Sequence, residues 1–182
     1  MFERYSEEAR RVIFFARYEA SEWGSPCIEP EHLVLGLLRE ARSLLDTLLL
    51  PGQSAEDLKR SVEATLSRGE KIPTSVDLPI SHSTKRIFAY GAEEAERLAS
   101  KPIRPEHLLL GILREGESTA ATVLTSYGLD IERLRRKMAI GPVAPKEDVL
   151  GALRRQFEPL ALRLTPEIEP ITVFSLETRV DE

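Results

Sequence analysis

The chain has 182 residues, of which 42% are hydrophobic and 30% charged, and its formal net charge is -5. This balance is typical of a globular protein and argues against a disordered or fibrous chain. The acidic charge disfavours nucleic-acid binding, because such proteins gain affinity from clustered Lys and Arg on phosphates. No segment approaches the roughly 20 consecutive apolar residues of a membrane span. We therefore expect a cytoplasmic protein with neither nucleic-acid nor membrane partners.

An internal duplication dominates the first three quarters of the sequence. Residues 30–40 (PEHLVLGLLRE) return as residues 105–115 (PEHLLLGILRE), with nine of eleven positions identical at an offset of 75. On both sides of this match, apolar residues recur at steps of one, three or four, as on a helix face; Val12, for example, falls on Ile87. Polar residues that occur in both copies are therefore candidates for a geometric role that is required twice.

Each copy predicts four helices in the same order. In the first copy, a helix from just after Ser6 to about Trp23 starts with a good N-cap, and a Leu-rich helix starts at Pro30, in a first turn that tolerates proline. Two shorter helices are expected at residues 43–49 and 55–66. The second copy repeats the series at about 84–98, from Pro105, at 118–127 and at 130–139.

Glycine recurs inside the Leu-rich helix of each copy, at Gly36 and Gly111. Glycine costs about 1 kcal/mol relative to alanine in a helix, so its presence in both copies indicates close backbone packing. The segment between the copies contains Gly69, Pro73 and Pro79 without a sustained period. It predicts an exposed, mobile linker.

The last part of the chain has no counterpart in the repeat. It predicts a short amphipathic helix at 146–158 and a strand at 171–176. A single strand is not stable alone, so it either caps the repeats or serves as a hook for a partner, and we favour the hook. The residues thus predict an all-α duplication of a four-helix repeat with an extension: repeat 1 at 1–66, a linker at 67–83, repeat 2 at 84–140 and the extension at 141–182.

Three segments closely resemble the Clp N-terminal repeat domain, which stands in front of the ATPase rings of Clp/Hsp100 unfoldases, most like the ClpC and ClpA branches: Phe2–Ala9, Pro30–Glu40 and Arg114–Leu124. The resemblance covers about residues 2–139. It implies a pseudo-twofold double Clp N-terminal motif that recruits substrates or adaptor proteins to a Clp ATPase or protease subunit.

One sequence motif of the full unfoldases does not occur in this chain. The phosphate loop Gly-x-x-x-x-Gly-Lys-[Ser/Thr] is absent from the whole sequence. We therefore expect a stand-alone repeat protein without AAA+ ATPase modules, with no enzymatic activity and no cofactor.

The resemblance also suggests acidic binding residues. In ClpC-type relatives the acidic residue of the Glu-His motif, in both repeats, receives a phosphorylated arginine side chain, and the matching positions here are Glu31 and Glu106. A carboxylate can accept a guanidinium through paired hydrogen bonds. The alternative is a first-turn glutamate that stabilises its own helix. Pro30 and Pro105 stand where family members commonly have Thr, so a hydroxyl hydrogen bond is missing.

Aromatic residues on the first helix are a second candidate for binding. Phe14, Phe15 and Tyr18 lie beside the core stripe and cannot all face inward, which predicts an exposed surface for a peptide or adaptor. Packing against the neighbouring repeat is the alternative. His32 and His107 lack a second ligand at helical spacing, so we expect structural histidines and no metal site.

Two classes of function remain compatible with the sequence. The first is a non-catalytic module that binds client or adaptor polypeptides, or a Clp subunit. The second is a structural or oligomerising helical repeat protein unrelated to proteolysis, in which the strand at 171–176 pairs between identical chains. The sequence leaves the oligomeric state open. Cys27 is the only cysteine, which excludes an internal disulfide, and we interpret it as a structural thiol.

Overall fold

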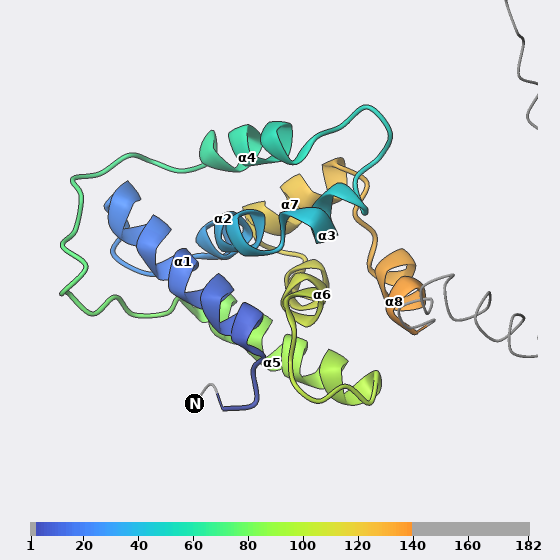
Figure 1. Cartoon of the computed structure of the whole chain (residues 1–182). Helices are drawn as coiled ribbons and strands as arrows, with labels where there is room; N and C mark the ends of the chain where they lie inside the picture. The colour runs from blue at the N-terminus through green and yellow to red at the C-terminus, as the bar shows by residue number, and fades with distance from the viewer. Residues whose placement is uncertain (1–2, 140–182) are drawn as a thin grey trace, which may run out of the picture. The chain divides into compact units, whose positions relative to one another are not determined.

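The computed structural model describes residues 3–139, which form eight α-helices and no β-strand (Figure 1). Repeat 1 contains α1 (Glu7–Trp23), α2 (Pro30–Glu40), α3 (Arg42–Asp46) and α4 (Ala55–Glu63). Repeat 2 contains α5 (His82–Arg97), α6 (Pro105–Glu115), α7 (Thr119–Ser126) and α8 (Ile131–Ala139). The predicted all-α class and the four-plus-four order are confirmed. The helix and strand predicted at 146–158 and 171–176 lie outside the described residues.

A serine caps the first helix of each repeat. The Ser6 hydroxyl accepts a hydrogen bond from the Ala9 amide at 3.2 Å, and the Ser81 hydroxyl accepts one from the Thr84 amide at 3.2 Å. Such a cap satisfies an N–H group that has no partner within the helix. Because Ser81 plays the part of Ser6, α5 begins at His82, two residues before the predicted start.

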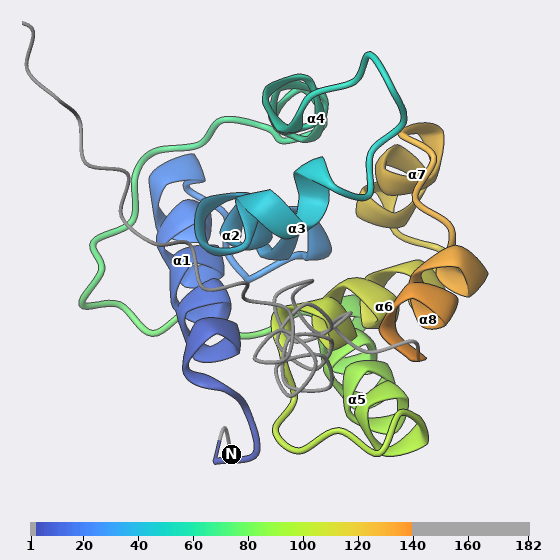
Figure 2. The same ribbon diagram turned by 45° about the vertical axis from the view of Figure 1, so that its right-hand side comes forward.

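The two Leu-rich helices form the centre of the core. In both views α2 and α6 lie inside the other helices, with α1 and α4 flanking α2 (Figures 1 and 2). Every residue from Pro30 to Leu38 is buried, which agrees with helices that are apolar on most sides. The largest fully buried apolar side chains of α2 and α6 are Leu33, Leu35, Leu37, Leu108, Leu109, Leu110 and Ile112.

Glycine lets the first two helices of each repeat meet backbone to backbone. A Cβ atom at Gly36 would collide with the carbonyl oxygen of Val12 on α1, and one at Gly111 would collide with the carbonyl oxygen of Ile87 on α5. These are matching positions in the two copies. The close packing predicted from the repeated glycine is therefore confirmed.

The repeats exchange backbone hydrogen bonds around a pseudo-twofold arrangement. The amide of Ile28 donates to the carbonyl of Pro79 at 2.8 Å, and the amide of Ser81 donates to the carbonyl of Ile28 at 3.2 Å. The matching bonds run from Ile103 to the carbonyl of Arg4 and from Ser6 to the carbonyl of Ile103, both at 2.8 Å. Each repeat thus fixes the backbone that leads into the first helix of the other.

The segment between the repeats is mostly exposed, as predicted, but it is tied down at several points. The Gly69 amide donates to the carbonyl of Trp23 at 2.8 Å, and the Ile72 amide donates to the carbonyl of Ser21 at 3.0 Å. Leu78 is buried in the core. The expectation of a mobile linker is therefore corrected, because Leu78 is buried and two backbone hydrogen bonds hold the segment against the end of α1.

We predict that Gly111→Ala lowers the free energy of unfolding by about 1–3 kcal/mol, the usual cost of overpacking. The new methyl group would collide with a carbonyl oxygen of α5, which is part of a helix and cannot move aside. Gly91→Ala is the matched control. Its Cβ would lie 2.9 Å from the carbonyl oxygen of His107, and repeat 1 already carries alanine there, as Ala16. Urea denaturation followed by circular dichroism should show the larger loss for Gly111→Ala; equal losses would contradict the proposed backbone contact.

Candidate binding surface

Aromatic side chains form a surface on the outer side of α1. Phe14 is 61% exposed, and its ring meets that of Phe15 edge-on at 5.6 Å between centroids. The guanidinium of Arg39, from the last turn of α2, lies over the rings of Phe15 at 5.5 Å and of Tyr18 at 4.9 Å. We refer to Phe14, Phe15, Tyr18 and Arg39 as the α1 aromatic surface. The structure thus brings together all three aromatic residues singled out in the sequence.

The corresponding surface of repeat 2 has a different character. At an offset of 75, Phe14 is replaced by Ala89 and Tyr18 by Glu93, and only Tyr90 keeps an aromatic ring. Arg114 lies over that ring at 4.5 Å. The Arg-on-aromatic contact is therefore common to both repeats, whereas the exposed aromatic area belongs to repeat 1.

Sequence reasoning missed an acidic partner of Arg39, the arginine of the α1 aromatic surface. The Nε atom of Arg39 lies 2.8 Å from Oε1 of Glu19, a residue of α1 that is only 8% exposed. Arg114 contacts Glu94 of α5 through a terminal nitrogen at 3.3 Å, while its other terminal nitrogen binds Glu93 at 2.6 Å. Both residues of the pair recur at an offset of 75, and this was a signal available in the sequence.

Glu31 is a buried link between the repeats. It is 9% exposed, and its Oε1 accepts a hydrogen bond at 3.0 Å from the amide of Ala120, in the first turn of α7. Burial raises the pKa of the Glu31 carboxyl above its ordinary value, although the hydrogen bonds from backbone amides oppose this shift. The carboxylate thus satisfies an N–H group at the start of a helix in the other repeat.

Glu106 has different surroundings, although it is the counterpart of Glu31. Its side chain is 23% exposed, and its nearest cation is Arg104, at 3.7 Å. The corresponding helix of repeat 1, α3, has five residues against the eight of α7. The two glutamates that the sequence treats as equivalent are therefore a buried one and a more accessible one.

The two histidines of the Glu-His motif cap their own helices. The Glu29 amide donates to Nδ1 of His32 at 3.0 Å, and the Arg104 amide donates to Nδ1 of His107 at 2.9 Å. Nε2 of His32 also lies 3.1 Å from the hydroxyl of Ser25. These are the packed, hydrogen-bonded histidines that the sequence predicted.

The single cysteine lies next to a carboxylate. Cys27 Sγ donates to Oε1 of Glu29 at 2.9 Å, and burial together with this bond raises the pKa of the thiol to about 11. The thiol is therefore protonated at neutral pH, which disfavours a nucleophile. Within residues 3–139, no group of three or more His, Cys, Asp or Glu side chains is arranged to hold a metal ion.

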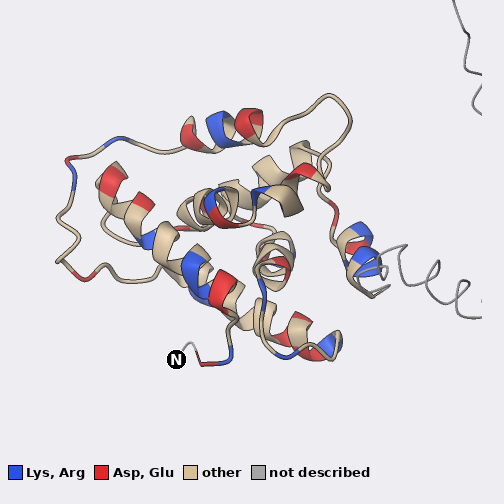
Figure 3. Ribbon diagram, viewed as in Figure 1, with Lys and Arg blue, Asp and Glu red and all other residues tan. Residues whose placement is uncertain are grey.

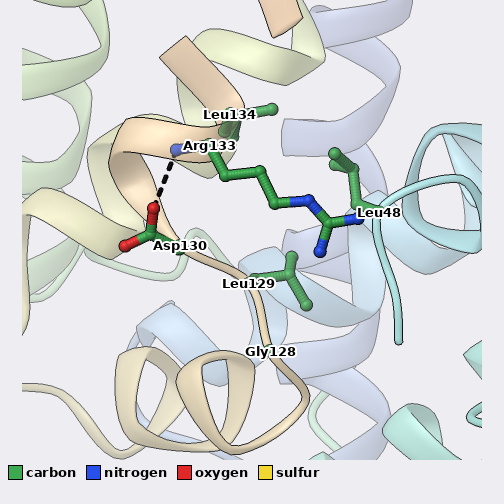
Figure 4. A pocket seen from close by; sticks show the side chains of 6 residues that line it. All are labelled: Leu48, Gly128, Leu129, Asp130, Arg133 and Leu134. Carbon is green, nitrogen blue, oxygen red and sulfur yellow. Dashed lines mark hydrogen bonds between the residues drawn. The ribbon is translucent and has the colours of Figure 1, made fainter. Parts of the chain in front are cut away.

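Three hollows in the surface differ in what they could hold. One, between the end of α3 and the start of α8, has a volume of about 10 Å³, enough for one water molecule (Figure 4). A second, of about 500 Å³, is lined by residues 3–4 and 100–103. The third, of about 260 Å³, borders the α1 aromatic surface at Arg39 and contains Glu19 in its wall.

Charged residues of both signs occur along α1, α4 and α8 (Figure 3). Near the end of α8, Lys137 donates to the carbonyl of Thr47 at 3.2 Å. Among the described residues, none of the helices has the length and apolar character needed to cross a membrane.

Comparison with known proteins gives one consistent result. A family model described as the Clp repeat (R) N-terminal domain matches residues 4–127 and 79–171. Chaperone protein ClpC1, chloroplastic, from Oryza sativa subsp. japonica is 37% identical over 153 residues, which are 84% of this chain and 16% of that protein. The chain thus spans about a sixth of the length of this curated relative.

Solved structures agree with the fold. The N-terminal domain of the caseinolytic protease associated chaperone ClpD from Arabidopsis thaliana is 28% identical, with a TM-score of 0.60, over 79% of this chain and all of that one. The N-terminal domain of Hsp104 from Candida albicans, 14% identical, has a TM-score of 0.60 over 75% of this chain and 89% of that one. The second likeness concerns the fold alone.

We predict that Glu31→Ala destabilises the protein by about 1–3 kcal/mol, because it leaves the buried amide of Ala120 without an acceptor. Glu106→Ala is the matched control and should cost less than about 0.5 kcal/mol, since its side chain is partly exposed and its ion pair is loose. Urea denaturation of both variants measures the difference. Equal costs would show that the Glu31–Ala120 bond adds nothing to stability.

We also predict that His32 stays neutral down to about pH 5, with its proton on Nε2, because Nδ1 accepts the Glu29 amide. Burial lowers the pKa of His32 from 6.5 to about 4. The unfolded chain therefore binds a proton between these values while the folded chain does not, so stability falls as the pH decreases through this window, by about 3 kcal/mol when complete.

Buried carboxyl groups act in the opposite direction, since burial raises the pKa of Glu19 and of Glu31. The histidine should therefore be measured directly. Nitrogen-15 chemical shifts of the imidazole ring report both the tautomer and the pKa. A proton on Nδ1 would show that the bond from the Glu29 amide to His32 is not formed, and a titration of His32 near pH 6.5 would show that burial does not lower its pKa.

Proposed function

The chain belongs to the Clp repeat N-terminal domain family, and on that premise we propose that it is a non-catalytic docking module for client or adaptor polypeptides of a Clp-type chaperone or protease. The observation that carries this proposal is the α1 aromatic surface. Exposed aromatic residues supply large contact areas at low entropic cost and are enriched where proteins bind one another.

The difference between the repeats supports this assignment. The contacts that maintain the fold recur in both copies: the glycine crossing, the histidine cap and the pairing of a buried glutamate with an arginine. Phe14, in contrast, is 61% exposed in repeat 1 and has Ala89 as its counterpart. A solvent-facing phenylalanine that the fold does not need in the second copy is best explained by a partner.

We propose that the acidic residues of the Glu-His motif contribute unequally. Glu106 is the more accessible carboxylate, and a guanidinium of a client could displace its loose contact with Arg104 at 3.7 Å. Glu31 would have to release the amide of Ala120 before it could bind a partner in the same manner. Recognition of phosphorylated arginine, which the resemblance suggests, would therefore begin at Glu106.

The alternative is a structural or oligomerising repeat protein. It depends on the predicted strand at 171–176, which lies outside the described residues. Light scattering of the purified protein separates the two proposals, because a monomer excludes pairing between identical chains. The cytoplasmic location remains a prediction, and the name of the rice relative includes the word chloroplastic.

We predict that immobilised protein retains a Clp ATPase subunit, a Clp protease subunit or their adaptor from native cell extract, as identified by mass spectrometry. Phe14→Ala should reduce this retention about tenfold, which corresponds to about 1.4 kcal/mol and is ordinary for an aromatic anchor. Phe14 is exposed, so its removal should leave the melting temperature nearly unchanged.

A matched pair of variants identifies the repeat that binds. Phe15→Ala and Tyr90→Ala each remove a ring that lies under an arginine at the same position of its repeat. Only Phe15→Ala should weaken retention. If no Clp component is retained, or if the two variants weaken retention equally, the proposed docking on the α1 aromatic surface is wrong.

A further inference from the structure

A buried carboxylate occupies the same position in both repeats. Glu19 of α1 is 8% exposed and Glu94 of α5 is fully buried. Each is paired with the arginine at the end of the next helix, Arg39 in repeat 1 and Arg114 in repeat 2. Burying a carboxylate is costly unless charges and hydrogen bonds compensate it, so each site needs cationic partners.

Repeat 2 supplies a second guanidinium to this carboxylate. Arg135 of α8 binds Glu94 with both ends of its fork: Nε lies 3.0 Å from Oε2, and a terminal nitrogen lies 2.6 Å from Oε1. This is the bidentate geometry in which arginine and carboxylate bind most strongly. Glu94 therefore has a complete set of partners from within the chain.

Repeat 1 lacks this second guanidinium. The residue of α4 that corresponds to Arg135, at an offset of 76, is Lys59, and it pairs with Glu63 at 3.7 Å. Beside Glu19 there is instead a hollow of about 260 Å³. Pockets for drug-sized ligands measure about 300–1,000 Å³, so this hollow suits a single side chain. Its lining combines apolar residues, Leu35, Leu38 and Ala55, with Glu19, Arg39, Arg42, Glu56 and Lys59.

The two carboxyl groups differ in pKa as this geometry requires. The hydrogen bond from Arg135 is the main reason why the pKa of Glu94 is lowered. Burial raises the pKa of Glu19, although Arg39 and Lys59 act in the opposite direction. Cationic partners thus offset the burial of the Glu94 carboxylate in repeat 2 but offset the burial of its counterpart Glu19 in repeat 1 only in part.

We propose that the hollow beside Glu19 binds an arginine side chain of a partner polypeptide, with the guanidinium placed as that of Arg135 is placed beside Glu94. The methylene groups of the ligand would pack on Leu35 and Leu38, and its guanidinium would bind the carboxylate of Glu19. The proposal rests on the proposed function only in taking a polypeptide as the source of this arginine. Because the hollow borders Arg39, one partner could reach both it and the α1 aromatic surface.

Each cation that lines the hollow already has an acidic partner. Arg39 is bound to Glu19 and stacked on the aromatic rings. Arg42 lies 3.7 Å from Glu56, and Lys59 lies 3.7 Å from Glu63, each as a loose pair with a partly exposed cation. Such exposed side chains can turn toward water when a guanidinium enters.

The test is a titration of the isotope-labelled protein with N-acetyl-arginine-N-methylamide, followed by the amide resonances of Glu19, Leu38 and Lys59. We expect shifts at these residues, and much smaller ones with N-acetyl-lysine-N-methylamide, which has the same charge but no planar fork. Equal shifts with the lysine derivative, or shifts at these residues only with N-acetylglutamate, would overturn the assignment to arginine.

Two substitutions exchange the residues that decide whether each buried glutamate is open to an arginine ligand. Lys59→Arg should place a guanidinium of the chain itself beside Glu19 and weaken binding of the arginine derivative at least tenfold. Arg135→Lys should open the corresponding site, so that the derivative now also shifts resonances around Glu94. Circular dichroism verifies that both variants are folded. Unchanged binding by Lys59→Arg would overturn the proposal, and if Arg135→Lys is unfolded the Lys59→Arg result decides alone.

The failure of this proposal can be distinguished from failure of the proposed function. Phe14→Ala should leave binding of the arginine derivative unchanged while it reduces retention of Clp components. If the derivative binds but no Clp component is retained, the arginine site stands without the proposed function. If Clp components are retained but the derivative does not bind, the arginine site is wrong and the docking function stands.

Discussion

The backbones of α1 and α2 meet at Gly36, where any side chain would strike the carbonyl oxygen of Val12, and the same contact holds α5 and α6 together at Gly111. This approach sets the distance and the crossing of the two longest neighbouring helices in each repeat. Arg39 lies one turn beyond Gly36 on α2, and for that reason its guanidinium reaches Glu19 and the rings of Phe15 and Tyr18 on α1. The binding surface depends on a contact that contains no functional side chain.

Comparison of the two copies distinguishes the residues that the fold requires from those that it does not require. Groups that the fold needs occur twice, such as His32 and His107, each of which caps its own helix through Nδ1. Other groups occur in one copy only, on the outer side of repeat 1, between the repeats or, as with Arg135, inside repeat 2. Phe14 and the Glu31–Ala120 bond are examples. The chain thus contains its own control for many substitutions, since the other copy shows what the fold tolerates.

Most of the fold could be predicted from the sequence, because it depends on local signals. Apolar spacing, the Ser6 cap and the repeated glycine each predict a feature that the structure contains, whereas the Ser81 cap of α5 was not predicted. The prediction of helix ends was less accurate. The structure ends α4 at Glu63, three residues before the predicted end, and the prediction was too long because the apolar pattern continues past the last helical turn. The different surroundings of Glu31 and Glu106 could not be predicted, because they depend on the tertiary position of α7. The role of Arg135 likewise depends on α8 and α5 meeting in space.

The backbone bonds that join the repeats have a further consequence. Ile28 bonds to Pro79 and Ser81, and Ile103 bonds to Arg4 and Ser6, so every donor in one half has its acceptor in the other. Two separate copies of a single repeat could form the same set of bonds as an isologous C2 homodimer. The present chain is equivalent to such a dimer fused into one polypeptide. Fusion removes the dependence of assembly on concentration and allows the two faces to diverge, an option that identical subunits lack.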